Sequence, residues 1–226
     1  MDENDITTFQ SAAQTHSLPP SIQITYHNSR LDDLPPSTTF DAIVSPANSY
    51  ARMDGGFDHA LSQAFSPQNN YMALTRVAQA ALYKEYRGFL PPGACLLVNL
   101  QDKQELNSLW GCKYLALCPT MRVPHEVTWD REVVYECIWS LLAAVDRHNR
   151  RVREQGGERE EEEIKSLLMT PLATGCGLWS TKKWAAQTVI AIRHFVEAME
   201  NEGKWKVMGP VRIMAHAVEV ERTFEL

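Results

Sequence analysis

The sequence contains no long apolar run. None of its hydrophobic stretches reaches the roughly 18 residues that a transmembrane helix needs, so we expect no membrane contact. The first 20 residues are polar and acidic, and they lack the basic start and apolar core of a secretory signal peptide. We therefore expect a cytoplasmic or nuclear protein.

Cysteine is scarce and irregularly spaced. The five cysteines are Cys95, Cys112, Cys118, Cys137 and Cys176, and no two of them form a Cys-x-x-Cys pair. An odd number of scattered cysteines does not support a disulfide framework, and a zinc site is not expected without paired cysteines. This usage is typical of a reducing compartment, and the sequence predicts neither a metal nor a cofactor.

Basic residues are outnumbered by acidic ones. The chain has 22 Lys and Arg against 28 Asp and Glu, which gives a formal net charge of −6. Nucleic-acid-binding proteins are usually basic, so a nucleic acid is an unlikely partner. This balance does not exclude a nucleotide held by backbone N–H groups. With 44% hydrophobic residues, the 226-residue chain can bury a core without disulfides.

Two common phosphate-binding patterns are also absent. The chain has neither a GxGxxG sequence nor a GxxxxGK[ST] sequence, so it matches neither the Rossmann fingerprint nor the P-loop. A nucleotide site in this protein would need loops of another kind.

Short apolar runs alternate with stretches of helical periodicity. The runs expected as strands are residues 21–26, 41–44, 94–99, 113–118, 166–170 and 211–218. Helical stripes begin near Asp58 and cover residues 74–82, 134–150 and 185–199. This order predicts a three-layer α/β/α sandwich with a mixed, largely parallel central sheet.

The chain is expected to form one domain preceded by an arm. Residues 1–20 are interpreted as a flexible N-terminal arm that ends at a Pro-Pro pair, and residues 21–226 as the domain. Residues 150–165 combine arginines, two glycines and a run of glutamates, which is typical of a charged, solvated insertion.

Two expected strand ends carry glycine-containing loops that lead into helices. The first loop follows residues 41–44, and the second covers residues 172–180. Ligands gather at the carboxyl ends of strands in open α/β sheets. Glycines let a backbone approach a ligand, and a helix N-terminus favours a negative group. Two such loops could hold a diphosphate from both sides, although a glycine pair before a helix is often only a turn.

The first loop resembles the motif of the macrodomain family of ADP-ribose-binding modules. That pattern reads DAIVNAAN, then several residues, then a glycine run and an aspartate that starts a helix. The matching residues here are 41–44, Ala47 with Asn48, Gly55 with Gly56, and Asp58, and Asn48 stands ten positions before Asp58 as in the family. The second loop, at residues 173–179, is similar to the family's other phosphate loop, written GTGxGG or STGIYG.

A finer resemblance is to a subgroup with SPAN in place of NAAN and with MDGG before the aspartate. These letters stand here at residues 45–48 and 53–56, and residues 118–124 are similar to the same subgroup. The resemblance implies a macrodomain-like sandwich with a cleft for ADP-ribose or for the ADP-ribosyl group of a modified protein.

The family motifs imply a role for each matching residue. Asn48 would hydrogen-bond the distal ribose and Asp58 would contact the same region, while backbone N–H groups of both loops would cradle the diphosphate. Asn28 would accept the adenine amino hydrogen bond, because the segment Tyr26–Arg30 lacks the family's usual acidic residue. The implied ligand-binding residues are Asn28, Ala47, Asn48, Gly55, Gly56, Asp58, Thr174, Gly175, Cys176, Gly177, Leu178 and Trp179.

Several alternatives stay open for single residues. Bulky Leu178 and Trp179 stand where the family has small residues, so Trp179 either stacks on a ribose or caps the hydrophobic core. Asp58 is either a catalytic carboxylate or a helix N-cap. Cys176 fits the loop as a small residue, and its alternative role is that of a nucleophile.

Three functions are compatible with these motifs. The favoured one is hydrolysis of an ADP-ribosyl bond, in a mono-ADP-ribosyl protein or O-acetyl-ADP-ribose, with Asp58 activating water and Asn48 orienting the ribose. The second is a reader module that binds ADP-ribose without chemistry. The third is a phosphatase acting on ADP-ribose 1″-phosphate.

Overall fold

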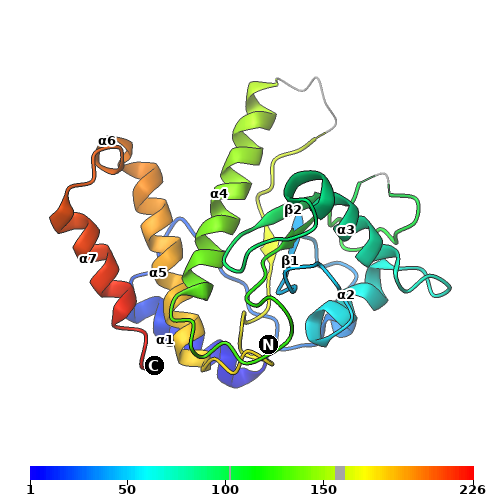
Figure 1. Cartoon of the computed structure of the whole chain (residues 1–226), viewed down its shortest axis with the longest axis horizontal. Coiled ribbons are helices and arrows are strands. Elements are labelled where there is room, and N and C mark those ends of the chain that lie inside the picture. Colours follow the sequence, from blue (N-terminus) through cyan, green and yellow to red (C-terminus); the bar gives the residue numbers. More distant parts are fainter. Residues whose placement is uncertain (102, 156–160) are drawn as a thin grey trace.

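A four-stranded sheet forms the centre of the computed structural model, which describes residues 1–101, 103–155 and 161–226 (Figure 1). The strands are β1 (Ala42–Ser45), β2 (Leu96–Asn99), β3 (Tyr114–Leu117) and β4 (Leu167–Leu168), in the spatial order β2-β3-β1-β4. Strand β1 pairs in parallel with β3 and β4, whereas β2 is antiparallel to β3. The expected mixed, largely parallel sheet is confirmed.

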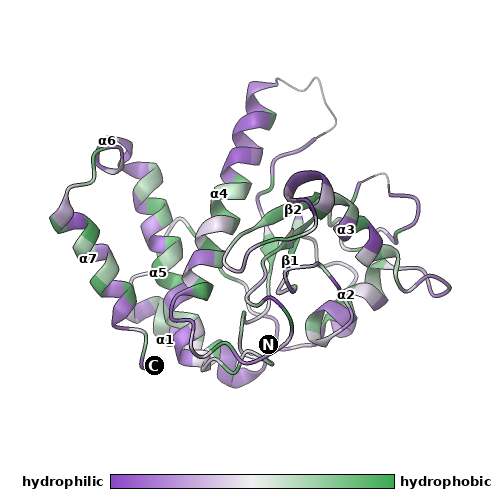
Figure 2. Cartoon of the chain, viewed as in Figure 1, coloured by the Kyte–Doolittle hydropathy of each residue, from purple (hydrophilic) through white to green (hydrophobic). Residues whose placement is uncertain are grey.

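The central strands are buried on both faces, which explains their continuous apolar sequences. All four residues of β1 and of β3 are buried. Side chains alternate between the two faces, so Ile43 and Leu115 belong to one core cluster, whereas Val44 and Ala116 belong to the other. Figure 2 shows the strands as mainly hydrophobic and the outer end of α4 as hydrophilic.

Helices α2 (Gly56–Phe65) and α3 (Ala73–Tyr86), with the short 3-10 helix η1 (Leu31–Asp33), cover one face of the sheet (Figure 1). The α2 residues Leu61 and Phe65 lie four positions apart, and both are buried in the core cluster of Ile43. The predicted apolar stripe of α3 is likewise buried there, through Leu74 and Leu82. The three-layer arrangement is completed by helices on the opposite face.

Helices α4 (Val133–Glu154) and α5 (Thr181–Glu200) cover the second face, and α1 (Glu3–Thr15) packs on α5 (Figure 1). The segment interpreted as a flexible arm therefore contains a helix with a buried residue, Phe9, whose ring lies 5.4 Å from that of Trp184. Asp2 and Asp5 form a capping box at its start. Trp184 lies about 175 positions after Phe9 in the sequence, so the pattern of residues 1–20 does not reveal that α1 packs on α5.

The expected strand at residues 211–218 is wrong. The chain there forms α7 (Pro210–Glu221), which follows the short α6 (Glu202–Trp205). Pro210 occupies the first turn of α7, where its missing N–H costs nothing, and the segment contains two alanines and a methionine, which favour helix. His216 and Val220, four positions apart, lie on the more buried side of this helix.

The segment 21–26 is also not a strand, although its backbone is not helical either. A cavity separates residues 23–27 from β4 and the residues after it, so no ladder of hydrogen bonds joins the two. Strand β4 itself is shorter than expected, with two residues instead of five. Within the expected charged insertion at 150–165, residues 150–154 continue α4, and residues 156–160 lie outside the described part.

Among the described residues, no helix combines the length and the apolarity that crossing a lipid bilayer requires.

Phe9→Ala tests whether α1 belongs to the folded unit. Phe9 is 5% exposed and packs on Trp184, so we expect the variant to lose about 3 kcal/mol in free energy of unfolding, measured by urea denaturation. The control is Gln10→Ala at the neighbouring exposed position, which should change the free energy of unfolding by less than about 0.5 kcal/mol. Equal stability of both variants would mean that α1 does not contribute to the core.

Candidate functional site

The carboxyl ends of β1, β3 and β4 meet at one edge of the sheet, because these three strands are parallel. Three connections start there. The first loop (residues 46–55) leads from β1 to α2, the second loop (residues 169–180) leads from β4 to α5, and a connecting segment (residues 118–132) leads from β3 to α4. Both loops singled out in the sequence therefore leave the same edge.

The side chain of Asn48 shapes the first loop. Its Oδ1 accepts hydrogen bonds from the N–H of Tyr50 at 3.0 Å and of Arg52 at 3.4 Å, and its Nδ2 donates to the carbonyl of Arg52 at 2.7 Å. One N–H of the amide remains for a ligand. Ala47, beside it, is completely buried in the core and contributes packing.

The start of α2 offers unused backbone donors. Gly55 is the N-cap and provides no side-chain acceptor, and the N–H groups of Gly56, Phe57 and Asp58 donate no hydrogen bond within the described residues. A Cβ added at Gly55 or Gly56 would meet nothing within 4 Å, and Gly56 has a positive φ of 54° that favours glycine. The backbone here is open to a ligand and rich in donors.

Asp58 lies beneath the first loop. It is 6% exposed, and the hydroxyl of Ser45 donates a hydrogen bond of 2.6 Å to its Oδ1. Burial raises the pKa of Asp58 to about 7, the Ser45 hydrogen bond lowers it, and the nearby Asp54 raises it. A carboxyl group with this pKa exchanges a proton near neutrality, which is a property of general acids and bases.

Two backbone hydrogen bonds close a turn within the second loop. The N–H of Leu178 bonds to the carbonyl of Gly175 at 3.0 Å, and that of Trp179 bonds to the carbonyl of Ala173 at 3.1 Å. Among the described residues, no acceptor pairs with the backbone N–H groups of residues 174–177. Gly175 and Cys176 are exposed, and the hydroxyl of Thr174 donates to the carbonyl of Pro171 at 3.4 Å.

Gly177 and Trp179 have structural roles in this loop. A Cβ at Gly177 would lie 2.4 Å from the carbonyl oxygen of Ala173, so the close approach of the backbone requires glycine. Trp179 is 4% exposed, its indole N–H donates to the carbonyl of Val127 at 3.0 Å, and the Lys183 ammonium lies 4.1 Å from its ring centre. Of the two roles considered for Trp179, the structure supports the core cap.

Met121 of the connecting segment touches both loops. Its carbonyl accepts the N–H of Ser49 at 3.1 Å, and its Sδ lies 3.6 Å from the Sγ of Cys176. Val127, further along the segment, donates its N–H to the carbonyl of Gly177 at 3.1 Å. The first loop thus contacts the backbone of Met121 and the second loop contacts its side chain, and this residue is 7% exposed.

A hollow adjoins the start of α2 on the side of β4. Its volume is about 690 Å³, and Asn28, Gly56, Phe57 and Thr170 are among the residues that line it. The structure therefore brings Asn28 close to Gly56. The sequence analysis did not single out Phe57 or Thr170 as site residues. A phenylalanine in an amphipathic helix is ordinarily a core residue, and Thr170 belongs to the segment 166–170 that was expected to be a strand.

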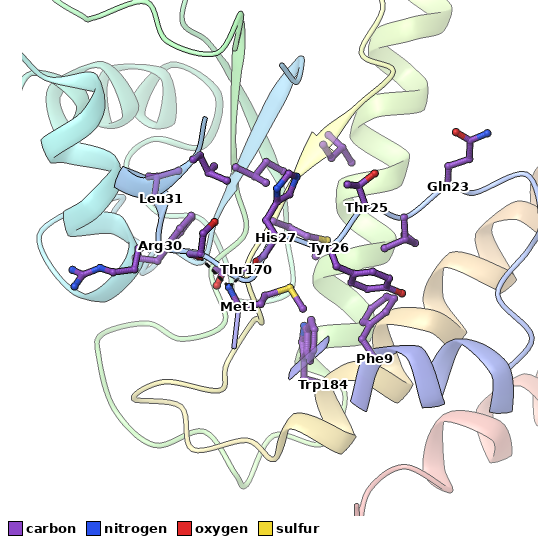
Figure 3. Close-up of a pocket in the computed structure, with 17 residues that line it drawn as sticks. Met1, Phe9, Gln23, Thr25, Tyr26, His27, Arg30, Leu31, Thr170 and Trp184 are labelled. Carbon is purple, nitrogen blue, oxygen red and sulfur yellow. Dashed lines mark hydrogen bonds between the residues drawn. The ribbon is translucent and has the colours of Figure 1, made fainter. Parts of the chain in front are cut away.

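A smaller cavity of about 170 Å³ adjoins this hollow and shares Arg30, Phe57 and Thr170 with it. Figure 3 shows Met1 beside Thr170, with Phe9 and Trp184 closing one side. The cavity is mainly apolar at this end.

No protein-family model matches the sequence, and no curated protein matches it either. Solved structures do match. A glycine-to-valine variant of the Oceanobacillus iheyensis macrodomain with ADPR is 18% identical, with 71% of this chain and 73% of that chain covered and a TM-score of 0.50. This chain has the macrodomain fold.

Two further solved structures with the macrodomain fold are similar to this chain. The macrodomain of Mycobacterium tuberculosis DarG is 19% identical, with 76% of this chain and 91% of that chain covered and a TM-score of 0.47. The Oceanobacillus iheyensis macrodomain with ADP is 15% identical, with 75% and 90% covered and a TM-score of 0.46.

Across residues 1–101, 103–155 and 161–226, no group of three or more His, Cys, Asp or Glu side chains is arranged to hold a metal ion. At the carboxyl edge the structure places unused backbone N–H groups, the amide of Asn48 and the buried carboxyl group of Asp58.

Asp58→Asn tests the environment of the buried carboxyl group. The pKa of Asp58 is about 7 in the folded chain and about 4 in an unfolded one, so folding favours the protonated form. The contribution of Asp58 to wild-type stability is therefore greatest below about pH 4 and falls as the pH rises through 7. Relative to Asp58→Asn, the wild type should lose on the order of 3 kcal/mol between about pH 4 and pH 8, measured by urea denaturation.

The exposed Asp33→Asn is the matched control, and its stability should follow the wild-type pH profile. Parallel profiles for wild type and Asp58→Asn would show that Asp58 is not desolvated.

Proposed function

We propose that this protein binds ADP-ribose, or the ADP-ribosyl group of a modified protein, at the carboxyl edge of its sheet. The observation that supports this most is the pair of backbone segments with unused N–H groups. Residues 56–58 begin α2 directly after the first loop, residues 174–177 belong to the second loop, and both loops contact Met121. Such donors hold a diphosphate without cationic side chains, so a net charge of −6 is no obstacle.

The macrodomain fold supports the choice of ligand. The Oceanobacillus iheyensis structure with the same fold carries ADPR. In our proposal the diphosphate lies between the two loops, and the adenine occupies the hollow lined by Asn28, Phe57 and Thr170. The distal ribose then reaches Asn48, which has one amide N–H left to donate.

Hydrolysis of an ADP-ribosyl bond is the activity that we propose for this site. It is favoured by the raised pKa of Asp58, about 7, because a base with such a pKa can take a proton from water at neutral pH. Ser45 holds Oδ1, which leaves Oδ2 to contact a water molecule. The alternative is a reader that binds without cleavage, and a phosphatase acting on ADP-ribose 1″-phosphate ranks third because it needs a nucleophile.

Gly175→Val tests the binding site. A Cβ at Gly175 would meet nothing within 4 Å, so the free protein accommodates the valine, but its side chain covers the donors of the second loop. Wild type should bind ADP-ribose in a calorimetric titration more tightly than AMP, ADP or ATP. The variant should bind ADP-ribose at least about tenfold more weakly, a loss of about 1.4 kcal/mol.

Gly209→Val is the matched control, because Gly209 lies before α7 and its Cβ would also meet nothing within 4 Å. It should bind like the wild type. If ADP-ribose bound no better than AMP to the wild type, the proposed ligand would be wrong.

Asp58→Asn also distinguishes the enzyme from the reader. On a mono-ADP-ribosylated protein, we expect the variant to release ADP-ribose about 100-fold more slowly than the wild type, while the Kd for ADP-ribose changes little. Asp54→Asn is the control, because Asp54 is a more exposed carboxylate four positions earlier, in the first loop, and this variant should keep the rate within about threefold. Tight binding by the wild type without any release would identify a reader.

A further inference from the structure

Exposed aromatic and arginine side chains gather beside the first loop. We name them the aromatic–arginine patch, formed by Tyr50, Tyr83, Arg87, Phe89 and Arg122. Three of them are aromatic residues with exposed fractions of 38%, 61% and 36%. Large aromatic groups are usually more buried than this, and an exposed group of them together with arginine is typical of protein-binding surfaces.

The patch is organised by contacts among its own members. The rings of Tyr50 and Phe89 lie edge to face with centres 5.7 Å apart. The guanidinium of Arg122 lies 5.3 Å from the Phe89 ring centre, and its Nε donates to the Tyr50 hydroxyl at 3.1 Å. A second pair, Arg87 over the Tyr83 ring at 5.6 Å, repeats the arrangement at the end of α3.

Neither arginine has an acidic partner in the part of the chain that the structure describes. Among the described residues, neither Arg87 nor Arg122 lies within 4.0 Å of a carboxylate. Each rests on an aromatic ring instead, which holds the guanidinium plane in place without neutralising its charge. In a chain of net charge −6, the patch therefore offers two positive charges to a partner.

The patch is continuous with the first loop. The N–H of Tyr50 bonds to the Asn48 side chain at 3.0 Å, and the N–H of Leu90, next to Phe89, bonds to the carbonyl of Ser49 at 2.9 Å. The N–H of Ser49 also lies 3.3 Å from the carbonyl oxygen of Arg122. A group attached to the distal ribose at Asn48 would therefore leave the site next to this patch.

We propose that the aromatic–arginine patch docks the polypeptide of an ADP-ribosylated protein and prefers acidic residues around the modified side chain. This inference rests on the proposed function, because it places the distal ribose at Asn48. Aspartate and glutamate of the partner form bidentate contacts with Arg122 and Arg87, and the exposed rings cover the aliphatic parts of the same segment.

The experiment compares three ligands by calorimetric titration. They are free ADP-ribose, a mono-ADP-ribosylated peptide with acidic flanking residues, and the same peptide with these residues changed to their amides. Wild type should bind the acidic peptide about tenfold more tightly than the other two, and this difference should shrink between about 0.1 M and 1 M salt.

Arg122→Gln should remove most of this preference and leave the affinity for free ADP-ribose unchanged, because Arg122 takes no part in the proposed cleft. Arg122→Lys should retain part of the preference, since it keeps the charge but loses the planar stacking. The control is Arg153→Gln, an exposed arginine at the far end of α4, which should bind all three ligands like the wild type.

Other outcomes separate the two proposals. If wild type binds ADP-ribose but does not distinguish the peptides, or if Arg122→Gln weakens free ADP-ribose equally, the docking inference is wrong and the proposed function stands. If wild type binds none of the three ligands, the proposed function itself fails. A dimer in sedimentation that Arg122→Gln dissociates would instead assign the patch to a second copy of the chain.

Discussion

The parallel pairing of β1 with both β3 and β4 is the constraint on which the site depends. It directs three carboxyl ends to one edge, so loops separated by more than 100 positions in sequence leave the sheet together. The pairing is secure because β1 is buried on both faces, and a shift of one residue would exchange Ile43 and Val44 between two different cores. Packing alone therefore positions the loops, before any ligand contributes.

An acidic protein can offer an anion site here because the positive potential comes from peptide groups. Burial raises the pKa of Asp58 to about 7, so this carboxyl group in the first turn of α2 is mostly neutral below pH 7 and about half ionised at pH 7. Its hydrogen bond to Ser45 ties the end of β1 to the first turn of α2. This contact thus fixes the start of α2, where the unused donors lie, relative to the end of the strand.

Hydrophobic periodicity predicted the strands β1 to β3 and the helices α2 to α5, because their buried residues recur at a regular spacing in the sequence. It failed where a distant partner decides the conformation, as for Phe9 in α1, which packs on Trp184, and for residues 21–26, which face a cavity instead of a strand. In the site, glycines marked the two loops, whereas the segment 118–124 was marked only by its resemblance, and the contacts of Met121 with both loops could not be predicted from it. Trp179 had two open roles until its contact with Val127 was known.

The two glycines of the second loop differ in whether the fold requires a glycine at that position. Gly177 is fixed by the carbonyl of Ala173, which a Cβ would approach to 2.4 Å, so this residue would be needed in a loop that bound nothing. Gly175, two positions earlier, has open space around its Cβ position, and the N–H groups of residues 174–177 have no acceptor within the described chain. The fold therefore requires glycine at position 177, but it does not account for the unused N–H groups of residues 174–177. In our proposal a ligand with several acceptor oxygens pairs with those donors, and this is the physical reason why we propose a diphosphate for these loops.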